Sequence, residues 1–416
     1  MQADLTESVQ TSIRPGEMKD VYYYGETNCE KQAYPAIVNT KFVQAFTNTG
    51  AGSSQFIVSP NGGVSDIVLW FQFPAGTYTG LSLNTGWGYS LINRVSVRYG
   101  SSGQYFWSGS QVLLQNLMDA ENNVKVDSIM SQGGNAVTGT SVAGANAYVY
   151  LKLPHNSCRA SGKPLPFSSD ILVQPIVITV ELLDPGSILI QQAGGTIPSG
   201  LSLAKAQLQV KQEMLTDSSD LLARRVDMNT EAYTFPLMYF AQQETQINVG
   251  VLSAPTTFNL TGFRGGEVRD IVLWLTLNSE STPGNGSYAP TKWYALGNLE
   301  LTYNGEIFSR YDAGSGALWN LVSDEKLNNA NSTTYTPSAA AGTSVATTSP
   351  WTVCPFSQVN VPYDREMLLC HGKPILNAVV QVKFSNPDTS NGYTLHAMYI
   401  YNASLLCSRG SADFVF

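Results

Sequence analysis

The sequence predicts an all-β protein built from two similar units in tandem. Short runs rich in Val, Ile, Tyr and Trp, bounded by turn residues, recur along the whole chain. Apolar residues at helical spacing are scarce, which argues against an α-helical or mixed fold. In addition, Asp66–Trp70 and Asp270–Trp274 have the same sequence, Asp-Ile-Val-Leu-Trp. Many short strands with polar connections predict a β-sandwich or β-barrel in each unit.

The similarity between the two units continues well beyond the repeated motif. Val97-Arg98-Tyr99 corresponds to Leu301-Thr302-Tyr303, and the offset equals that of the motif at 204 residues (303 − 99 and 270 − 66). Leu114–Leu117 corresponds to Leu318–Leu321 at the same offset. A constant offset indicates one structural unit built twice. At 416 residues the chain can hold two domains, each with its own core.

The expected strands of the first unit follow the β-rich runs in chain order, and the second unit is expected to repeat them. They lie at Ile67–Phe73, Arg94–Tyr99, Ala147–Leu153 and Ile176–Leu182. Only brief helices are expected, at Gln111–Glu121, at its copy Leu318–Lys326, and at Asp220–Val226.

A second pair of markers lies late in each unit. Gly162–Leu165 recurs as Gly372–Ile375 at an offset of 210 residues, whereas Leu203–Leu208 matches Leu395–Ile400 at 192. The first unit therefore has about 18 extra residues (210 − 192), which we assign to an enlarged loop at Asp184–Gly200.

Two further segments have the composition of exposed loops. Gln132–Ala147 is rich in Gly, Ala, Ser, Asn and Val, and Asn328–Pro350 is rich in Ser, Thr, Ala and Asn. They occupy matching places in the two units, which suggests that one end of each unit carries long exposed loops.

The composition of the chain limits the kinds of partner that it is expected to bind. Charged residues make up 13% of the chain, about half of the usual share, while the hydrophobic share of 43% is ordinary. Such surfaces suit a protein packed against neighbours. The net charge of −8 and the lack of a basic run predict no direct nucleic-acid binding. Met1–Lys19 lacks the apolar run of a signal peptide, and no stretch is apolar enough to span a membrane, so assembly inside a cell is expected.

No catalytic, cofactor or metal site is expected. Asp66 and Asp270 recur, but each precedes a β-rich run, which favours a hydrogen-bonding role at the start of a strand. The chain has three histidines and no His-x-His pair, so ligand spacing for a metal is missing. Asn331, within one of the loops, fits the glycan acceptor pattern and is the one such position singled out.

The core of each unit is expected around the repeated motif. The positions are Ile67, Leu69, Trp70, Ile271, Leu273 and Trp274, joined by Val97, Leu301, Ile176 and Ile178.

These features together resemble the double jelly-roll major capsid proteins of icosahedral double-stranded DNA viruses. The repeated Asp-Ile-Val-Leu-Trp resembles an early buried strand of that family. Gly162–Leu182, with Pro164 and Pro166, resembles the turn before its late strands, and Glu213–Tyr233 resembles its inter-barrel segment. The resemblance covers the chain from about Gln32 to Phe416.

The resemblance implies a double jelly roll, with two tandem eight-stranded units. It implies an N-terminal arm at 1–30, a first jelly roll at 31–215, a linker at 216–230 and a second jelly roll at 231–416. The implied function is a non-enzymatic major capsid protein that forms pseudo-hexagonal homotrimers in the virion, with the loops named above outermost. The implied partners are the chain itself, penton and minor capsid proteins and, indirectly, an internal membrane.

One alternative of another class stays open on the sequence. A tandem β-sandwich carbohydrate-binding protein or glycosidase would use aromatic side chains to stack on sugars, and would need a pair of carboxylates in a cleft for hydrolysis. The aromatic candidates are Trp87, Tyr105, Trp107, Trp293 and Tyr294. An enzymatic pair of cupin barrels is disfavoured because histidines are too few.

Overall fold

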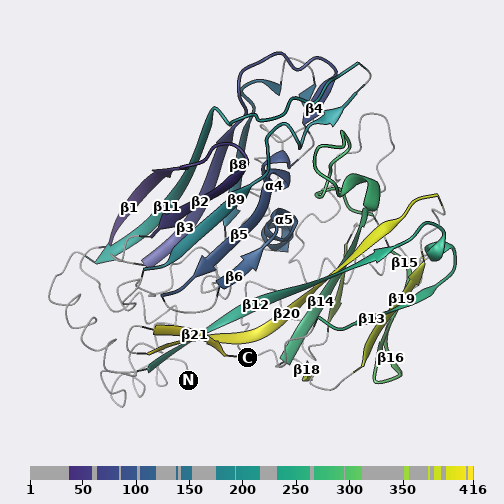
Figure 1. Cartoon of the computed structure of the whole chain (residues 1–416). Helices are drawn as coiled ribbons and strands as arrows, with labels where there is room; N and C mark the ends of the chain where they lie inside the picture. The colour runs from purple at the N-terminus through teal and green to yellow at the C-terminus, as the bar shows by residue number, and fades with distance from the viewer. Residues whose placement is uncertain are drawn as a thin grey trace, which may run out of the picture.

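The structure is a computed structural model, and it shows two β-rich halves lying side by side (Figure 1). It describes residues 37–58, 63–83, 86–100, 104–118, 137–138, 142–151, 175–192, 194–215, 232–262, 267–294, 296–311, 351–355, 373–374, 379–385, 390–408 and 411–415.

The first half contains two four-stranded antiparallel sheets. One has the order β1-β11-β3-β8 and the other β2-β9-β5-β6. The strands are β1 (Ile37–Ala45), β2 (Gly52–Ile57), β3 (Gly63–Gln72), β5 (Ile92–Arg98), β6 (Gln104–Trp107), β8 (Asn146–Leu151), β9 (Val177–Leu182) and β11 (Lys205–Leu215). A small third sheet, β10-β4-β7, joins β4 (Leu81–Leu83), β7 (Val137–Thr138) and β10 (Ile190–Gln191). Two short helices, α4 (Trp87–Leu91) and α5 (Gly109–Met118), lie on the side that faces the second half (Figure 1).

The second half also contains two main sheets. The first has the order β12-β20-β14-β17, with β18 added to β14 and β21 added to β20, and the second has the order β13-β19-β15-β16. The elements are β12 (Ala232–Ile247), η4 (Val251–Ser253), β13 (Thr256–Leu260), β14 (Glu267–Leu277), η5 (Asn278–Glu280), β15 (Gly297–Tyr303), β16 (Glu306–Tyr311), β17 (Trp351–Pro355), β18 (Lys373–Pro374), β19 (Val380–Ser385), β20 (Tyr393–Ser408) and β21 (Ser411–Val415).

The two halves have the same strand topology. When the eight main-sheet strands of each half are numbered in chain order, both halves pair them as 1-8-3-6 and 2-7-4-5. This closed pairing of first with last and second with seventh strand is that of a jelly roll. The expected all-β double jelly roll is therefore confirmed.

The repeat extends to a backbone irregularity. In β3 the register against β11 skips Ser65, and in β14 the register against β20 skips Arg269. Ser65 and Arg269 are separated by the same offset as the two copies of the motif. Each irregularity is a β-bulge directly before the repeated motif. Asp270, expected at the start of a strand, instead lies within β14 and is buried.

Side chains of the repeated motif fill the core of each half, with one correction. Ile67 and Leu69 are buried in the first half and Ile271 and Leu273 in the second, as are Val97, Leu301, Ile176 and Ile178. Trp274 is buried, but Trp70 is only half-buried and lies outside the core. The reason is the alternation of a strand: Trp70 points away from the face that carries Ile67 and Leu69.

The segment Asp184–Gly200, expected as an enlarged loop, packs partly into the protein. Ile188 and Leu189 are buried. The Asp184 carboxylate accepts backbone hydrogen bonds from Gly186 at 2.8 Å, from Gly200 at 2.6 Å and from Leu201 at 3.2 Å. The segment is thus a folded insertion closed by one side chain.

The expected helix at Gln111–Glu121 corresponds to α5. Other expectations fall outside the described residues: the helices at Leu318–Lys326 and Asp220–Val226, the N-terminal arm, the linker, Asn331, Asn328–Pro350 and most of Gln132–Ala147. Within the described ranges, no helix has the length and apolarity needed to cross a membrane.

Candidate assembly site: the seam between the halves and the open face of the first half

The two halves meet where strand β6 of the first approaches strand β12 of the second (Figure 1). The backbone N–H of Phe240 in β12 donates a hydrogen bond to the hydroxyl oxygen of Tyr105 in β6 at 2.6 Å. The ring of Tyr105 lies edge-on to Tyr239, with centroids 4.6 Å apart, and equally close to Trp107. Because β12 is an edge strand, this bond occupies a backbone donor that no neighbouring strand could reach.

The C-terminal strand completes an aromatic cluster at this contact. Phe414 of β21 lies 5.9 Å from Tyr105, 5.8 Å from Tyr239 and 6.2 Å from Tyr99, measured between ring centroids. We call Tyr99, Tyr105, Tyr239 and Phe414 the seam cluster. Each such aromatic pair stabilises by about 0.5–1.5 kcal/mol beyond simple burial. The second half thus reaches across with the β12-β20-β21 end of its sheet.

A second contact involves the folded insertion. The backbone N–H of Gln191 donates to Gly286 O at 2.7 Å, and that of Gly284 donates to Ser187 O at 2.8 Å. Gly286 has a positive φ of 79°, and a Cβ there would lie 2.8 Å from Cβ of Gln191. Only glycine satisfies both constraints. The insertion, which we call the clasp (residues 184–200), therefore holds a loop of the second half.

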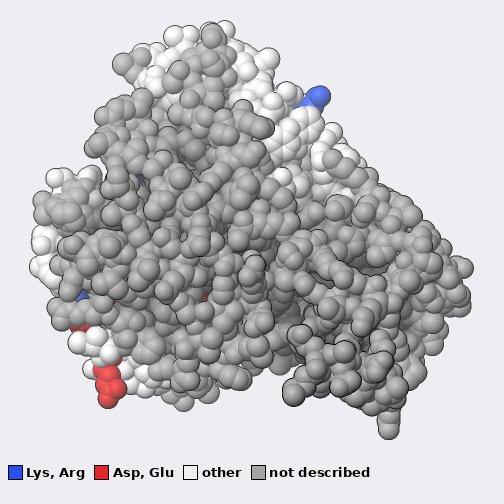
Figure 2. Space-filling model, turned by 180° about the vertical axis from the view of Figure 1, so that it is seen from behind, with Lys and Arg blue, Asp and Glu red and all other residues white. Residues whose placement is uncertain are grey.

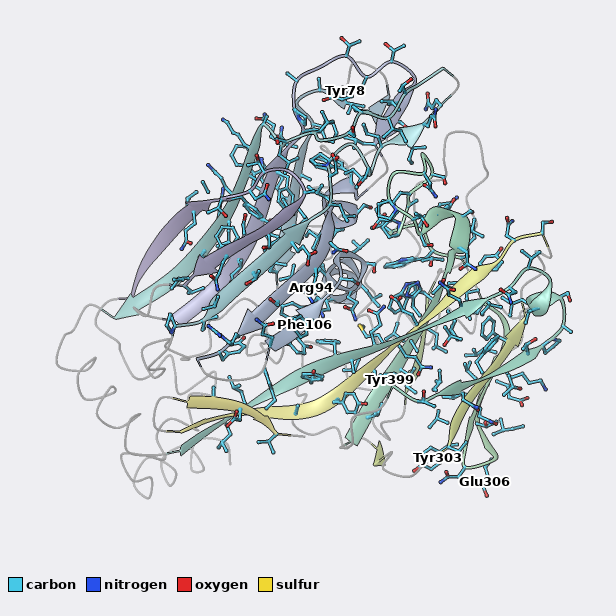
Figure 3. All side chains as sticks on the ribbon, viewed as in Figure 1. Tyr78, Arg94, Phe106, Tyr303, Glu306 and Tyr399 are labelled. Atoms are coloured by element: carbon cyan, nitrogen blue, oxygen red, sulfur yellow. The ribbon has the colours of Figure 1, made fainter. Side chains whose placement is uncertain are left out.

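Beside the seam cluster lies a groove of about 510 Å³, with Tyr239 among its lining residues. Arg94 and Phe106 lie in it between the halves (Figure 3), with the Arg94 guanidinium 5.1 Å above the Phe106 ring and its Nε 3.5 Å from Glu181 Oε2. The described residues that line it are Asn93, Arg94, Phe106, Trp107, Ser108, Gln111, Glu181, Tyr239, Phe240, Ala241, Gln242 and Gly262. Glu181 is the one carboxylate among them, whereas glycoside hydrolysis requires two.

The aromatic residues proposed for sugar stacking are not available for it. Trp87, Tyr105, Trp107 and Trp293 are all buried. Tyr294 is half-buried, and its hydroxyl donates a hydrogen bond to Glu280 Oε2 at 3.0 Å. Tyr105 packs on Tyr239 across the seam, whereas Trp87 and Trp293 pack within their own halves, on Phe73 and Trp274. The carbohydrate-binding alternative therefore loses the observation that motivated it.

His396 lies on the second half's sheet beside Trp274. The two rings are stacked at 5.0 Å with an interplanar angle of 5°. His396 Nε2 is 2.8 Å from Thr276 Oγ1, and Nδ1 is 3.3 Å from Glu244 Oε1. The hydrogen bond with His396 lowers the pKa of Glu244, against the opposing effect of burial. Across the described residues no group of three metal-ligating side chains occurs, and His155 and His371 lie outside them.

The outer faces of the two equivalent sheets differ sharply. In β14 every residue from Ile271 to Leu277 is buried, whereas in β3 buried and half-buried residues alternate from Ile67 to Gln72. The face of β14 that points away from its own core is covered. Trp293, which precedes β15, lies 6.0 Å from Trp274 between ring centroids, and the α4 and α5 side of the first half lies towards this sheet (Figure 1). The hydroxyls of Ser90 in α4 and Thr291 meet there at 3.4 Å.

The corresponding face of the first half has an exposed apolar surface. We call it the open face; it comprises Val43, Val68, Trp70, Tyr148 and Tyr150 on β1, β3 and β8. Trp70 stacks on Tyr148 with centroids 6.4 Å apart and an interplanar angle of 12°. Its indole N–H donates to Asn146 Oδ1 at 3.3 Å, and Lys205 Nζ lies 5.6 Å above its ring. Val43 and Tyr148 are 51% and 40% exposed.

Few charged side chains appear among the described residues on the rear face of the molecule (Figure 2). On the rear face, the described part is mainly uncharged, with Lys, Arg, Asp and Glu as isolated spots (Figure 2). Apolar or neutral faces are cheap to desolvate, so such a surface suits contact with another protein.

No family model matches the sequence, and a search of curated protein sequences gave no match. Solved structures do match over nearly the whole chain. A structure of VP54 of PBCV-1, fitted into a reconstruction of the virophage Sputnik, is 12% identical with a TM-score of 0.61, covering 92% of this chain and 96% of that one. The Sputnik virophage structure is 13% identical with a TM-score of 0.58 (91% and 88%), and the Faustovirus major capsid protein is 12% identical with a TM-score of 0.54 (90% and 91%).

These structures are double jelly-roll major capsid proteins of double-stranded DNA viruses. The chain has the same double jelly-roll fold, as its strand topology independently requires.

Proposed function

We propose that this chain is the major capsid protein of an icosahedral double-stranded DNA virus and that it works as a homotrimer. The observation that carries the proposal is the pairing of two jelly rolls of identical topology, packed side by side, with one sheet face buried at the seam and its counterpart left open. The likeness to capsid proteins over nine-tenths of the chain supports it.

The geometry explains why three copies are expected. Two similar units in one chain approximate a third of a six-unit ring, and three copies around a three-fold axis give a pseudo-hexagonal tile. In the chain, the contact between units is heterologous, because the β6 edge of one half meets the β12 edge of the other. A heterologous contact repeated by rotation closes into a ring when the rotation between units is one sixth of a turn, as the proposed tile requires.

The remaining parts follow from this function. We assign residues 1–30 to an arm, 31–215 to the first jelly roll, 216–230 to the linker and 231–416 to the second. The tile would join neighbouring tiles, penton proteins and minor capsid proteins in the virion, and would contact an internal membrane only through them. No enzymatic activity and no direct binding of nucleic acid are part of the proposal.

Electron microscopy of the purified chain tests the proposal. Class averages with a six-lobed outline and three-fold symmetry are expected, and their arrays or closed shells would extend the support to assembly. Two-lobed particles at every concentration would contradict a capsomer role and would leave the double jelly roll as a fold with another use.

A further inference from the structure

We propose that the open face of the first half is the docking surface for the second half of another copy of this chain. The contact between two chains would have the same arrangement as the contact that joins the two halves within one chain. It rests on the proposed trimer and adds the residues through which that trimer forms.

The strand registers identify the open face with the face that is covered inside the chain. On the first half, Val43, Gln209, Val68 and Tyr150 form one row across the sheet, and Trp70 and Tyr148 lie opposite each other in the next row. On the second half the matching rows are Gln242, Met398, Val272 and Val353, then His396, Trp274 and Trp351.

Burial separates the two surfaces. Met398, Val272 and Trp274 are completely buried, and Gln242 lines the groove against the first half. In the matching rows of the first half, Val68, Trp70 and Tyr150 are only half-buried, and Val43 and Tyr148 are exposed. A second copy that supplies the missing cover therefore fits this face.

The strand registers also identify which strands of the second copy would contact the open face. Within the chain the first half uses the β5–β6 end, where Val95 pairs with Trp107. The equivalent pair in the second half is Leu299 with Tyr311, since both residues follow their counterparts at the offset of the repeated motif. The β15–β16 strands would accordingly approach the open face.

Exposed apolar side chains mark this end of the second half. Ile307 in β16 is 58% exposed and Val379 is 56% exposed. Val379 is held beside the β15–β16 turn, because Asn304 N–H donates to Val379 O at 2.8 Å and Val379 N–H donates to Asn304 Oδ1 at 2.9 Å. Figure 3 shows the neighbouring Tyr303 and Glu306 at the tip of this hairpin, remote from the seam. We call this region the outer end.

The open face has the composition of a protein interface, with aromatic and apolar side chains next to polar ones. Stacked aromatic rings at Trp70 and Tyr148 lie beside Val43 and Val68, and the polar side chains of Lys205, Gln207 and Gln209 lie among them. Aromatic residues in such a setting dominate binding energy, while the polar surroundings contribute little by themselves.

Two arginine substitutions test the docking. Tyr148→Arg places a second cation near Lys205 on the open face, and Ile307→Arg charges the outer end. Both positions are substantially exposed, so the fold should persist, which circular dichroism and thermal melting would verify. By sedimentation velocity over a concentration series, each variant should dissociate at concentrations at least about tenfold higher than the unmodified trimer. Val249→Arg, at a 62% exposed valine outside both regions, should leave the trimer unchanged.

Mixing the two variants distinguishes this contact from other modes. The Tyr148→Arg chain keeps an intact outer end and the Ile307→Arg chain keeps an intact open face. A mixture should therefore form a dimer of about 90 kDa (2 × 45.0 kDa), with no trimer. Trimers of Tyr148→Arg as stable as the unmodified ones would overturn the inference alone. An unmodified chain that never forms trimers would instead overturn the proposed function.

Discussion

Trp70 and Trp274 occupy the same position in two copies of one sheet, yet they have different environments. Each ends an Asp-Ile-Val-Leu-Trp motif, and each motif directly follows a β-bulge. Trp274 is fully buried between His396 and Trp293, whereas Trp70 is half-buried beneath Tyr148 and Lys205. The difference arises because Trp293 and the neighbouring first half cover this face of the second half's sheet, whereas the described residues leave the matching face of the first half partly accessible.

Truncating the two tryptophans should therefore have unequal effects on stability. Trp274→Ala should lower the free energy of unfolding by about 3–5 kcal/mol, since it empties a closed site. Trp70→Ala in the isolated chain should cost about 1 kcal/mol, because water can occupy the vacated space. Guanidinium unfolding of both variants checks this, and equal costs would contradict the assignment of Trp70 to an open face.

The hydroxyl of Tyr105 should stabilise the seam through one hydrogen bond. Tyr105→Phe keeps the aromatic packing but leaves the Phe240 N–H without its acceptor, at a cost of about 1–3 kcal/mol. Hydrogen exchange measured by mass spectrometry should show faster exchange of peptides that contain Phe240. Unchanged protection there would mean that the two halves do not depend on this bond.

A pair of glycine substitutions separates the contribution of the clasp contact from that of backbone strain. Gly250 and Gly286 both have a φ of 79°, but a Cβ at Gly250 has nothing within 4 Å while one at Gly286 meets Gln191. Gly250→Ala reports the backbone strain alone, about 1–2 kcal/mol. Gly286→Ala should destabilise further, by at least about 1 kcal/mol, because the Gln191–Gly286 contact must open. Similar losses in thermal unfolding for both variants would show that the clasp does not hold the halves.

Acid should weaken the chain partly through Glu244. Its pKa is lowered in the folded state by His396, so the carboxylate adds stability above the ordinary carboxyl pKa. This contribution disappears as the pH falls through the lowered pKa of the folded state. Between about pH 5 and pH 3, Glu244→Gln should show a shallower decline of melting temperature than the unmodified chain. Parallel curves would exclude a role for the pair.

The architecture could be predicted from the sequence because the two copies of the repeat are similar over short, recognisable segments. The motif at 66–70 and 270–274, its constant offset and the strand-rich composition together predicted two all-β units, and the matching bulges at Ser65 and Arg269 show how deep the repeat goes. Local sequence could not separate Trp70 from Trp274, because their difference lies in which sheet face another half covers.

Long-range pairing also determines two features of the late part of the chain that the sequence did not show: the length of the insertion and its contacts. Strand pairing aligns Leu208 with Leu69 and Ala397 with Leu273, so Leu208 corresponds to Ala397 and not to Ile400, its match by sequence similarity. Strand pairing also aligns Ile178 with Val97 and Val382 with Leu301, an offset of 204 residues (382 − 178), which falls to 189 at Leu208 and Ala397 (397 − 208). The first half's insertion is therefore 15 residues long (204 − 189), shorter than the 18 residues that the sequence comparison gave. The change of offset predicted an enlarged loop there, but the hydrogen bonds of Asp184 and the contacts with the second half are visible only in the folded chain.

The residues of the seam cluster were missed for the same reason. Tyr105 and Phe240 lie 135 positions apart, and no spacing rule joins them. One available signal was the run of aromatic residues near Tyr239 at the start of the second half, which is longer than a strand buried on one face needs.

The most direct measurement is the mass of the unmodified chain in solution by light scattering coupled to size exclusion. We expect a single species of about 135 kDa (3 × 45.0 kDa) that persists on dilution. A species of 45.0 kDa at all concentrations would contradict the proposal that this double jelly roll is a capsomer subunit.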